Sequence, residues 1–191
     1  MVLVPEVFHG LNPIGTVLTY DDEGKNKGNN DKWAKPLEHH DSDTQSLIEF
    51  VKRQSYCSGN VGAMGVCIGG HLAYRAALNP FIKAAFCFYA TDIHSNTLPA
   101  QPGNNSFERM ADILGEIHFI WGKQDPHVPQ DGRDKIYQQA VRTGIYYQWK
   151  EVNAQHAFMR DEGERYDAAL AIAMYQQAVA LFNRALALTH T

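Results

Sequence analysis

The amino-acid sequence predicts an α/β fold in which a mostly parallel sheet carries helices on both faces. Three observations lead to this prediction. Stretches with strand character alternate with stretches of helical character along the chain. Residues 83–90, KAAFCFYA, form a continuous apolar run, which is typical of a parallel strand buried on both faces. Residues 61–71, VGAMGVCIGGH, pass from a small apolar stretch through glycines into a helical pattern, as a strand followed by a crossover helix would.

The N-terminal part of the chain predicts one strand and one helix separated by a long loop. Residues 2–8 are apolar and β-branched and fit a short buried strand, although Pro5 weakens the pattern. Residues 11–37 are rich in Gly, Asn, Asp and Lys and predict a loop, whose length is typical of loops that line a site. The Asp-Ser-Asp sequence at 41–43 can cap a helix that continues to about Gln54.

The rest of the chain alternates between strands and helices. Strands are predicted from apolar or aromatic runs, and helices from apolar residues at helical spacing. The last helix is long, with Ala, Leu, Ile and Phe recurring along one side. The predicted strands are residues 61–66, 83–90, 116–121 and 145–152, the predicted helices are 71–78, 131–143 and 164–188, and residues 91–106 are a loop.

The composition is that of an ordinary globular protein and argues against several functions. The 191 residues, of which 45% are hydrophobic and 20% charged, suit a single domain over residues 1–191. A net charge of −4 shows no basic excess, so nucleic acid is not an expected partner. No apolar run approaches the ~20 residues of a membrane span, and the start MVLVPEVFHG lacks the pattern of a signal peptide. Cys57, Cys67 and Cys87 show neither metal-ligand spacing nor a disulfide pattern, which favours a cytoplasmic location and no metal.

The central motif is Gly65-Val66-Cys67-Ile68-Gly69, a nucleophile between glycines at a strand-to-helix turn. It matches the pattern G-x-S-x-G with cysteine in place of serine, where a side chain at either flanking position is expected to collide with backbone. Cys67 would lie at a helix N-terminus, which favours its thiolate, and the Ile68 N–H would face the oxygen of an attacked carbonyl. The alternative interpretation is a glycine-rich turn around a buried, inert cysteine.

Two later loops supply the partners that such a nucleophile needs. Asp125 follows one predicted strand and His156 follows the next. In parallel sheets the functional loops lie at the carboxyl ends of the strands. The chain order Cys67, Asp125, His156 resembles the nucleophile–acid–histidine order of α/β-hydrolases, in which the carboxylate orients the imidazole and the imidazole moves the proton. Taken singly, Asp125 before Pro126 also fits a plain turn, and His156 also fits a solvated loop residue.

Together these motifs resemble the dienelactone hydrolase family of α/β-hydrolases. The resemblance implies a three-layer α/β-hydrolase-type sheet and hydrolysis of small esters or lactones without a metal or cofactor. It also implies that Cys67 forms an acyl-enzyme, that Asp125 orients His156, and that Ile68 supplies an oxyanion N–H. The matching segments are GVCIGGH at 65–71, YATDIH at 89–94, WGKQDPHVP at 121–129, and HAF at 156–158 followed by Arg160.

The resemblance also points to residues that would contact the substrate. Arg160 matches an arginine that binds the substrate carboxylate, a role suited to the planar guanidinium. A surface salt bridge with Asp161 or Glu162 is the alternative. Tyr89 and His94 follow a predicted strand near the mouth of the site and are candidate substrate contacts, with core packing as the alternative for Tyr89. His127, after the strand that ends at Trp121, is also near the predicted mouth and is a further candidate contact.

The N-terminal region departs from the family pattern. Family members carry earlier strands, a glutamate beside the nucleophile and a second oxyanion N–H. Residues 6–8, with Glu6, look similar to that early glutamate segment, but only one helix is readable between residue 8 and the next predicted strand. The early strands are therefore expected to be missing, with residues 5–8 matching a later strand end, so that an apolar sheet edge and half an oxyanion hole remain. The chain is expected to be a monomer or a weak homo-oligomer. A non-catalytic binding or assembly subunit is the alternative function, and a thiol redox role for Cys67 is weaker because no second cysteine is close in sequence.

Overall fold

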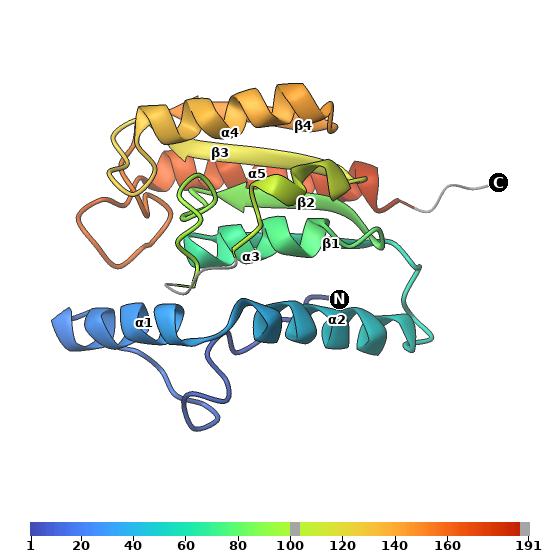
Figure 1. Cartoon of the computed structure of the whole chain (residues 1–191), viewed down its shortest axis with the longest axis horizontal. Helices are drawn as coiled ribbons and strands as arrows, with labels where there is room; N and C mark the ends of the chain where they lie inside the picture. The colour runs from blue at the N-terminus through green and yellow to red at the C-terminus, as the bar shows by residue number, and fades with distance from the viewer. Residues whose placement is uncertain (100–103, 188–191) are drawn as a thin grey trace.

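The computed structural model describes residues 1–99 and 104–187, which form a four-stranded sheet with helices around it (Figure 1). The strands lie side by side in the order β1-β2-β3-β4, and every neighbouring pair is parallel. The prediction of an α/β fold with a parallel sheet is confirmed, and each strand begins and ends within two residues of its predicted range. The strands are β1 (Val61–Val66), β2 (Ile82–Phe88), β3 (Glu116–Gly122) and β4 (Tyr147–Val152).

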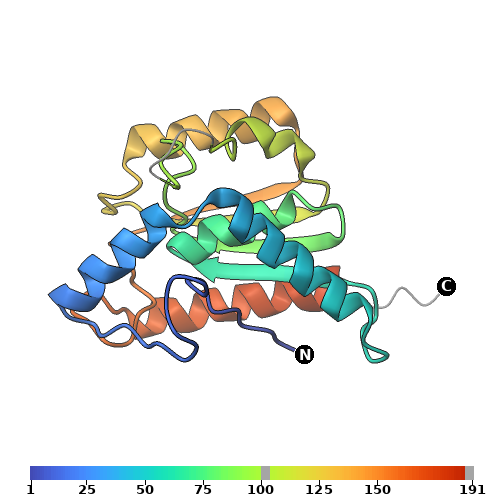
Figure 2. The same cartoon turned by 60° about the horizontal axis from the view of Figure 1, so that its bottom comes forward.

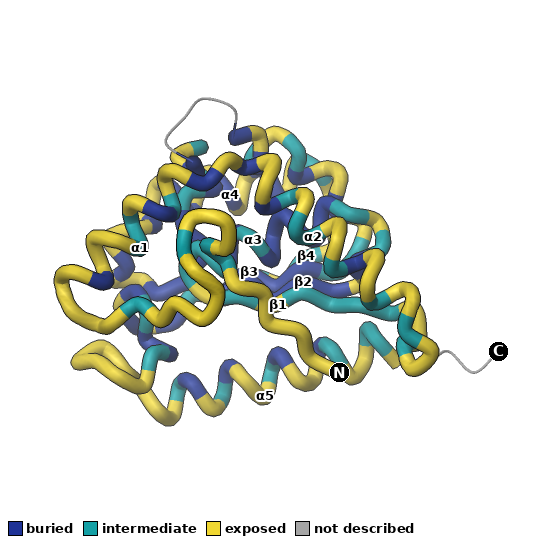
Figure 3. The backbone as a smooth tube through the Cα atoms, turned by 90° about the horizontal axis from the view of Figure 1, so that it is seen from below, coloured by how far each residue is buried: buried dark blue, intermediate teal, exposed yellow. Residues whose placement is uncertain are grey.

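Helices cover both faces of the sheet and make three layers. On one face lie α3 (Ile68–Ala77), α4 (Gln130–Thr143) and the short 3-10 helix η1 (Glu108–Asp112). Helix α2 (Leu37–Lys52) packs against α3 on the same side (Figure 2). Helix α5 (Ala168–Ala185) covers the opposite face (Figure 3).

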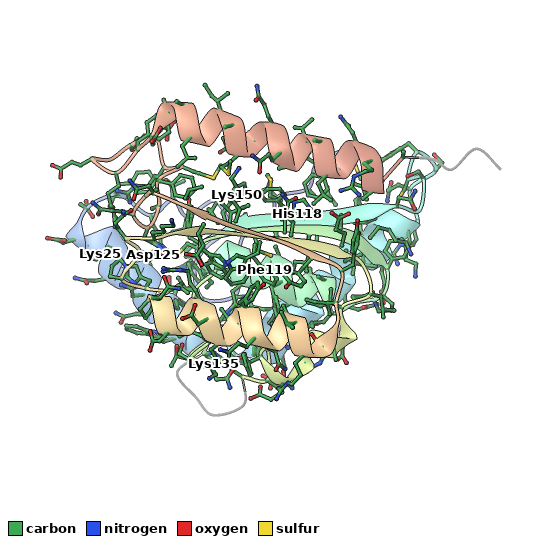
Figure 4. All side chains as sticks on the ribbon, turned by 90° about the horizontal axis from the view of Figure 1, so that it is seen from above. Lys25, His118, Phe119, Asp125, Lys135 and Lys150 are labelled. Atoms are coloured by element: carbon green, nitrogen blue, oxygen red, sulfur yellow. The ribbon has the colours of Figure 1, made fainter. Side chains whose placement is uncertain are left out.

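Side chains that alternate along the central strands fill the two faces. In β2, Cys87 belongs to the apolar cluster under α3 and α4, whereas Phe86 belongs to the cluster under α5. In β3, Phe119 lies on the α4 side and His118 lies against Phe86 on the α5 side (Figure 4). Successive side chains of a strand point to opposite faces. A strand covered on both faces is therefore apolar throughout, which is why residues 83–90 reveal it.

The N-terminal segment differs from its prediction. Residues 2–8 form no strand and are exposed or half-buried, with Val2 85% and Val4 87% exposed. Their apolar, β-branched pattern suits a strand, but a strand also needs a neighbour to hydrogen-bond with, and Pro5 lacks the N–H to do so. The predicted buried strand over residues 2–8 is therefore wrong, whereas the match of residues 5–8 with a strand end of the family stays a prediction.

The loop predicted for residues 11–37 contains a helix, α1 (Asp22–Ala34). The Asp21 side chain caps it by accepting a hydrogen bond from the Gly24 N–H at 2.8 Å. The helix is polar all round and buries only two of its residues, so its sequence has no apolar periodicity by which it could be recognised.

The other helices are found where predicted, with shifted starts. Helix α2 begins at Leu37, directly after Pro36 and before the expected cap at 41–43, because Pro is tolerated at a helix start and Leu37 is buried. Helix α3 begins three residues before its predicted start, directly after Cys67, at the strand-to-helix turn that we call the elbow (residues 65–69). Helix α5 begins at Ala168, capped by Asp167, and its predicted end at 188 lies outside the described residues.

β1 forms an edge of the sheet. In the described part of the chain β2 is the strand paired with it, and no residue pairs along its other side. Met64 is 51% exposed and Val66 is 44% exposed. Residues 61–66 carry no charged side chain, although charges commonly protect such edges. The expected absence of earlier strands agrees with this edge, which lies immediately before Cys67.

Candidate active site

The turn between β1 and α3 holds Cys67 in a strained backbone conformation. Its φ of 56° and ψ of −123° lie in a region that residues with a side chain rarely adopt. The Cys67 N–H donates to the Phe88 carbonyl at 3.1 Å, and the Cys67 carbonyl accepts from the His71 N–H at 3.2 Å. These bonds fix Cys67 at the N-terminus of α3, where free N–H groups and the helix dipole favour a negative charge.

Close contacts require glycine at two of the three positions around this turn. A Cβ on Gly65 would lie 2.0 Å from the Gly69 carbonyl oxygen, and one on Gly70 would lie 2.7 Å from the Phe88 carbonyl oxygen. A Cβ on Gly69 would meet nothing within 4 Å. The expected collision at both flanking positions is therefore correct for Gly65 and wrong for Gly69.

Gly65 and Gly69 provide a matched test of this turn. Gly65→Ala should lower the free energy of unfolding by about 3 kcal/mol, because the added methyl group meets backbone that cannot move aside. Gly69→Ala should change it by less than about 1 kcal/mol, since the site is open and alanine favours a helix. Urea unfolding followed by circular dichroism measures both. Equal stabilities of the two variants would contradict the geometry of the turn.

Asp125 and His156 meet at the end of the sheet where the strands stop. Asp125 lies in the loop after β3 and His156 in the loop after β4, and both are buried. The Asp125 Oδ2 is 2.7 Å from the His156 Nδ1, and its Oδ1 accepts a hydrogen bond from the His127 N–H at 2.8 Å. Figure 4 shows Asp125 between the layers of α4 and α5. With Nδ1 bonded to the carboxylate, Nε2 is the imidazole nitrogen left for a reaction partner.

The surroundings of His156 favour its charged form. Burial by itself lowers the pKa of His156, but the hydrogen bond with Asp125 and the neighbouring Cys67 side chain outweigh it and raise this pKa to about 9. At neutral pH the imidazole therefore carries a proton. The structure brings Cys67, Asp125 and His156 into one group, although they come from three separate loops.

The backbone around Cys67 offers one donor to an oxyanion. Ile68 is the first residue of α3, and the first N–H groups of a helix have no partner within it. Glu6, in the N-terminal segment, does not supply a carboxylate here: its Oε1 accepts a hydrogen bond from the Gly15 N–H at 2.9 Å, within its own loop.

Tyr89 and His94, the candidate substrate contacts after β2, have different surroundings. Tyr89 is 1% exposed, its burial raises the pKa of its hydroxyl, and its ring centroid lies 4.9 Å from that of His156. It therefore supports His156 from the interior. The His94 ring lies against Gly132 at the start of α4, where an added Cβ would come within 2.6 Å of it, and burial lowers the pKa of His94. Its contacts are directed toward α4.

Arg160 contacts an aromatic ring and forms no salt bridge with Asp161 or Glu162. Its guanidinium lies over the ring of Tyr20, 4.6 Å from the ring centroid, so the segment before α1 reaches the loop that follows His156. Asp161 and Glu162 do not pair with it. Among the described residues, the arginines that form ion pairs are Arg75, Arg109, Arg133 and Arg184. The Arg160 guanidinium thus has no carboxylate partner among these residues.

His127 and Lys32 also lie near the site, and sequence reasoning missed Lys32. The ring of His127 lies edge-on to His156, with 4.5 Å between centroids. Lys32, in the unrecognised helix α1, pairs with Asp92 in the loop after β2 at 2.7 Å. The sequence predicts His127 near the mouth of the site, as a possible substrate contact, whereas nothing in the pattern around Lys32 indicates its partner.

The described residues contain neither a candidate metal site nor a candidate membrane span. Over residues 1–99 and 104–187, no three side chains of the types His, Cys, Asp and Glu gather in a way that could hold a metal ion. Over the same ranges, each helix is too short or too polar to span a bilayer.

The sequence of this chain matches a known protein family over nearly its whole length. Residues 1–186 match the model of the "Dienelactone hydrolase family". The chain belongs to this family. It is 37% identical over 194 residues to a Saccharomyces cerevisiae protein named "Putative carboxymethylenebutenolidase", covering 97% of this chain and 70% of the relative. It is 26% identical over 159 residues to the carboxymethylenebutenolidase of Pseudomonas putida, covering 82% of this chain and 63% of the relative. The resemblance inferred from the motifs is confirmed.

Solved structures share the fold at lower sequence identity. The "Putative Dienelactone Hydrolase" of Klebsiella pneumoniae matches with a TM-score of 0.65 and 21% identity, over 74% of this chain and 59% of its own. The dienelactone hydrolase-like promiscuous phosphotriesterase P91 from metagenomic libraries matches with a TM-score of 0.62 and 21% identity, over 78% of this chain and 62% of its own. This dienelactone hydrolase family member therefore has an α/β-hydrolase-type fold, and it spans 59–70% of the length of these four proteins.

Proposed function

We propose that this chain hydrolyses small esters or lactones through an acyl-enzyme on Cys67. The observation that carries the proposal is the strained Cys67 at the N-terminus of α3, with a buried Asp125–His156 pair beside it. Membership of the dienelactone hydrolase family supports hydrolysis as the reaction class. No metal or redox group is needed for this chemistry, since a thiolate, a proton carrier and an oxyanion donor suffice.

In the first half-reaction the Cys67 thiolate attacks the carbonyl carbon of the substrate. The carbonyl oxygen becomes an oxyanion, toward which the Ile68 N–H donates. As the C–O bond breaks, the protonated His156 gives its proton to the departing alkoxide, and a thioester on Cys67 remains. A raised pKa of His156 suits this step, because the imidazole must begin it as an acid.

In the second half-reaction water replaces the alcohol. His156, now neutral, takes a proton from a water molecule, whose oxygen attacks the thioester carbonyl. The C–S bond breaks, Cys67 leaves as thiolate, and the product is a carboxylic acid. Asp125 keeps the imidazole in one orientation through both steps and stabilises its positive charge.

Selective alkylation tests the proposal. Iodoacetamide should remove the hydrolysis of p-nitrophenyl acetate in step with labelling of the Cys67 peptide, because one thiolate serves both reactions. Cys57, in the loop after α2, is the internal control, and its labelling should not follow the loss of turnover. Full turnover after complete labelling of Cys67 would exclude the proposed function.

The pH dependence of turnover follows from the raised pKa of His156. A pKa near 9 means that His156 is protonated in the resting enzyme at neutral pH and loses this proton as pH rises through about 9. The value of kcat/KM should therefore fall above about pH 9, because the leaving alkoxide loses its acid. The charged imidazole beside Asp125 also contributes to the free energy of unfolding. This contribution should be complete below about pH 6.5 and should disappear as the pH rises through about 9. A rate that keeps rising through about pH 10 would contradict this assignment.

Arg160 is proposed to bind a carboxylate of the substrate. The proposal is supported by a guanidinium that is half-exposed, lies in the loop after His156 and lacks a carboxylate partner among the described residues. Arg160→Met should raise KM for an ester that carries a second, free carboxylate by about tenfold, and leave KM for a neutral ester within about twofold. Arg165→Met, at an exposed arginine of the same loop, is the matched control. Equal effects on both esters would overturn the assignment.

The exposed edge of β1 favours a second candidate function, that of a binding or assembly subunit. An apolar edge strand with free backbone groups is a template for pairing with another chain. In this alternative the chain retains Cys67 but does not hydrolyse esters. Hydrolysis that depends on Cys67 would exclude it, and sedimentation analysis would separately test the prediction of a monomer or weak homo-oligomer.

A further inference from the structure

His156 is held between two aromatic rings that approach it from the interior and from the surface. The ring of Tyr89, which is buried, meets it at an interplanar angle of 66°. The ring of His127, which is exposed, meets it at 63°, with the 4.5 Å centroid distance noted above. Edge-to-face contacts at such distances are attractive and directional. The imidazole of His156 is therefore restrained on two sides in addition to its bond with Asp125.

We propose that His127 is a positioning residue whose ring holds the imidazole of His156 in line between Asp125 and Cys67. The inference rests on the proposed function for its catalytic meaning, but the restraint on His156 is a property of the folded chain. The His127 backbone N–H bonds to the same carboxylate that binds His156, so the ring is placed relative to the very group that it supports.

The charge state of His127 suits this role. Burial and the positive charge of His156 lower the pKa of His127, while the nearby Asp125 raises it and Lys32 of α1 and Arg165 lower it further. A neutral ring can lie against a charged imidazolium, whereas a second cation there would repel it. An aromatic ring, and not a titratable group, is thus what the position requires. Phenylalanine should therefore replace histidine, and alanine should not.

Two variants at this position separate positioning from general structure. His127→Ala removes only the ring, since the backbone N–H that bonds to Asp125 is retained. We expect kcat for p-nitrophenyl acetate to fall about tenfold with KM unchanged within about twofold, because small displacements of a catalytic group cost rate more than binding. His127→Phe should return kcat to within about twofold of the wild type. His39→Ala, at an exposed histidine of α2, is the matched control.

The alkylation rate of Cys67 with iodoacetamide at neutral pH reads the same restraint without ester turnover. It should slow several-fold in His127→Ala and recover in His127→Phe, because the thiolate depends on a well-placed imidazolium. If the two variants show this pattern of labelling but the wild type hydrolyses no ester, the positioning role holds and the proposed function fails. If His127→Ala matches the wild type in both labelling and kcat, or if His127→Phe is as impaired as His127→Ala, the positioning role is overturned.

Discussion

Cys67→Ala is expected to lower kcat for an activated ester by more than about 10⁴-fold, to the residual rate that substrate binding and the oxyanion donor alone support. The reason is that the proposed pathway runs through a thioester on this sulfur, and no other side chain at the elbow can form one. Binding should suffer little, so the protein should still be inhibited competitively by a stable analogue such as a small ketone or amide. Steady-state hydrolysis and an inhibition series on the same preparation measure both quantities.

Cys57→Ala is the matched control, because it makes the same substitution at a different free cysteine. Cys57 is also a free, half-buried cysteine, but it lies in the loop after α2, where its Sγ accepts a hydrogen bond from the Gly59 N–H. Its replacement should leave kcat within about twofold. Residual turnover in Cys67→Ala comparable to that of Cys57→Ala would mean that hydrolysis, if present, uses another nucleophile.

Asp125→Asn is expected to lower kcat by about 10³–10⁴-fold without unfolding the protein. The amide oxygen can still accept the His127 N–H, but the amide nitrogen would then face the His156 Nδ1 and turn it from a donor into an acceptor. The neutral imidazole would then carry its proton on Nε2. This nitrogen could no longer accept a proton from water. The pKa of His156 should fall below about 9, since Asp125 contributes to raising it.

The size of this effect distinguishes a catalytic carboxylate from a turn residue. If Asp125 only shaped the turn before Pro126, asparagine would replace it with little loss, because both residues favour such turns. Asp112→Asn, at an exposed aspartate of η1 that pairs with Arg109, controls for the loss of a negative charge. A similar kcat in both variants would remove Asp125 from the site.

The sequence predicts the sheet and its layers well because burial on two faces leaves a strong local pattern. Residues 84–90 are apolar throughout, residues 117–121 are apolar except for His118, and both segments belong to central strands. Residues 2–8 carry a similar pattern but lack a neighbouring strand, and pairing is a property of the whole fold that no local pattern contains. Helix α1 was not predicted because it lacks the hydrophobic periodicity by which helices are recognised. It is stabilised instead by its cap and by local polar contacts.

Some residues of the candidate site can likewise be predicted from local patterns, and others depend on the whole fold. Cys67, Asp125 and His156 are predictable because each follows a strand, and parallel strands deliver their carboxyl ends to one edge. The edge-to-face contacts of Tyr89 and His127 with His156, and the contact of Arg160 with Tyr20, depend on how the loops lie in space. The collision at Gly65 and its absence at Gly69 likewise depend on the direction of each Cβ, which spacing alone does not give.

The most direct test of the account is the mass of the Cys67 peptide after rapid quenching of a reaction with p-nitrophenyl acetate. Because this ester has a good leaving group, breakdown of the thioester should limit turnover and the intermediate should accumulate. We predict one acetyl group on the peptide that contains Cys67, and none on the peptides that contain Cys57 or Cys87. Steady hydrolysis with no acetyl group on Cys67, or with the acetyl group on a different residue, would contradict the central claim.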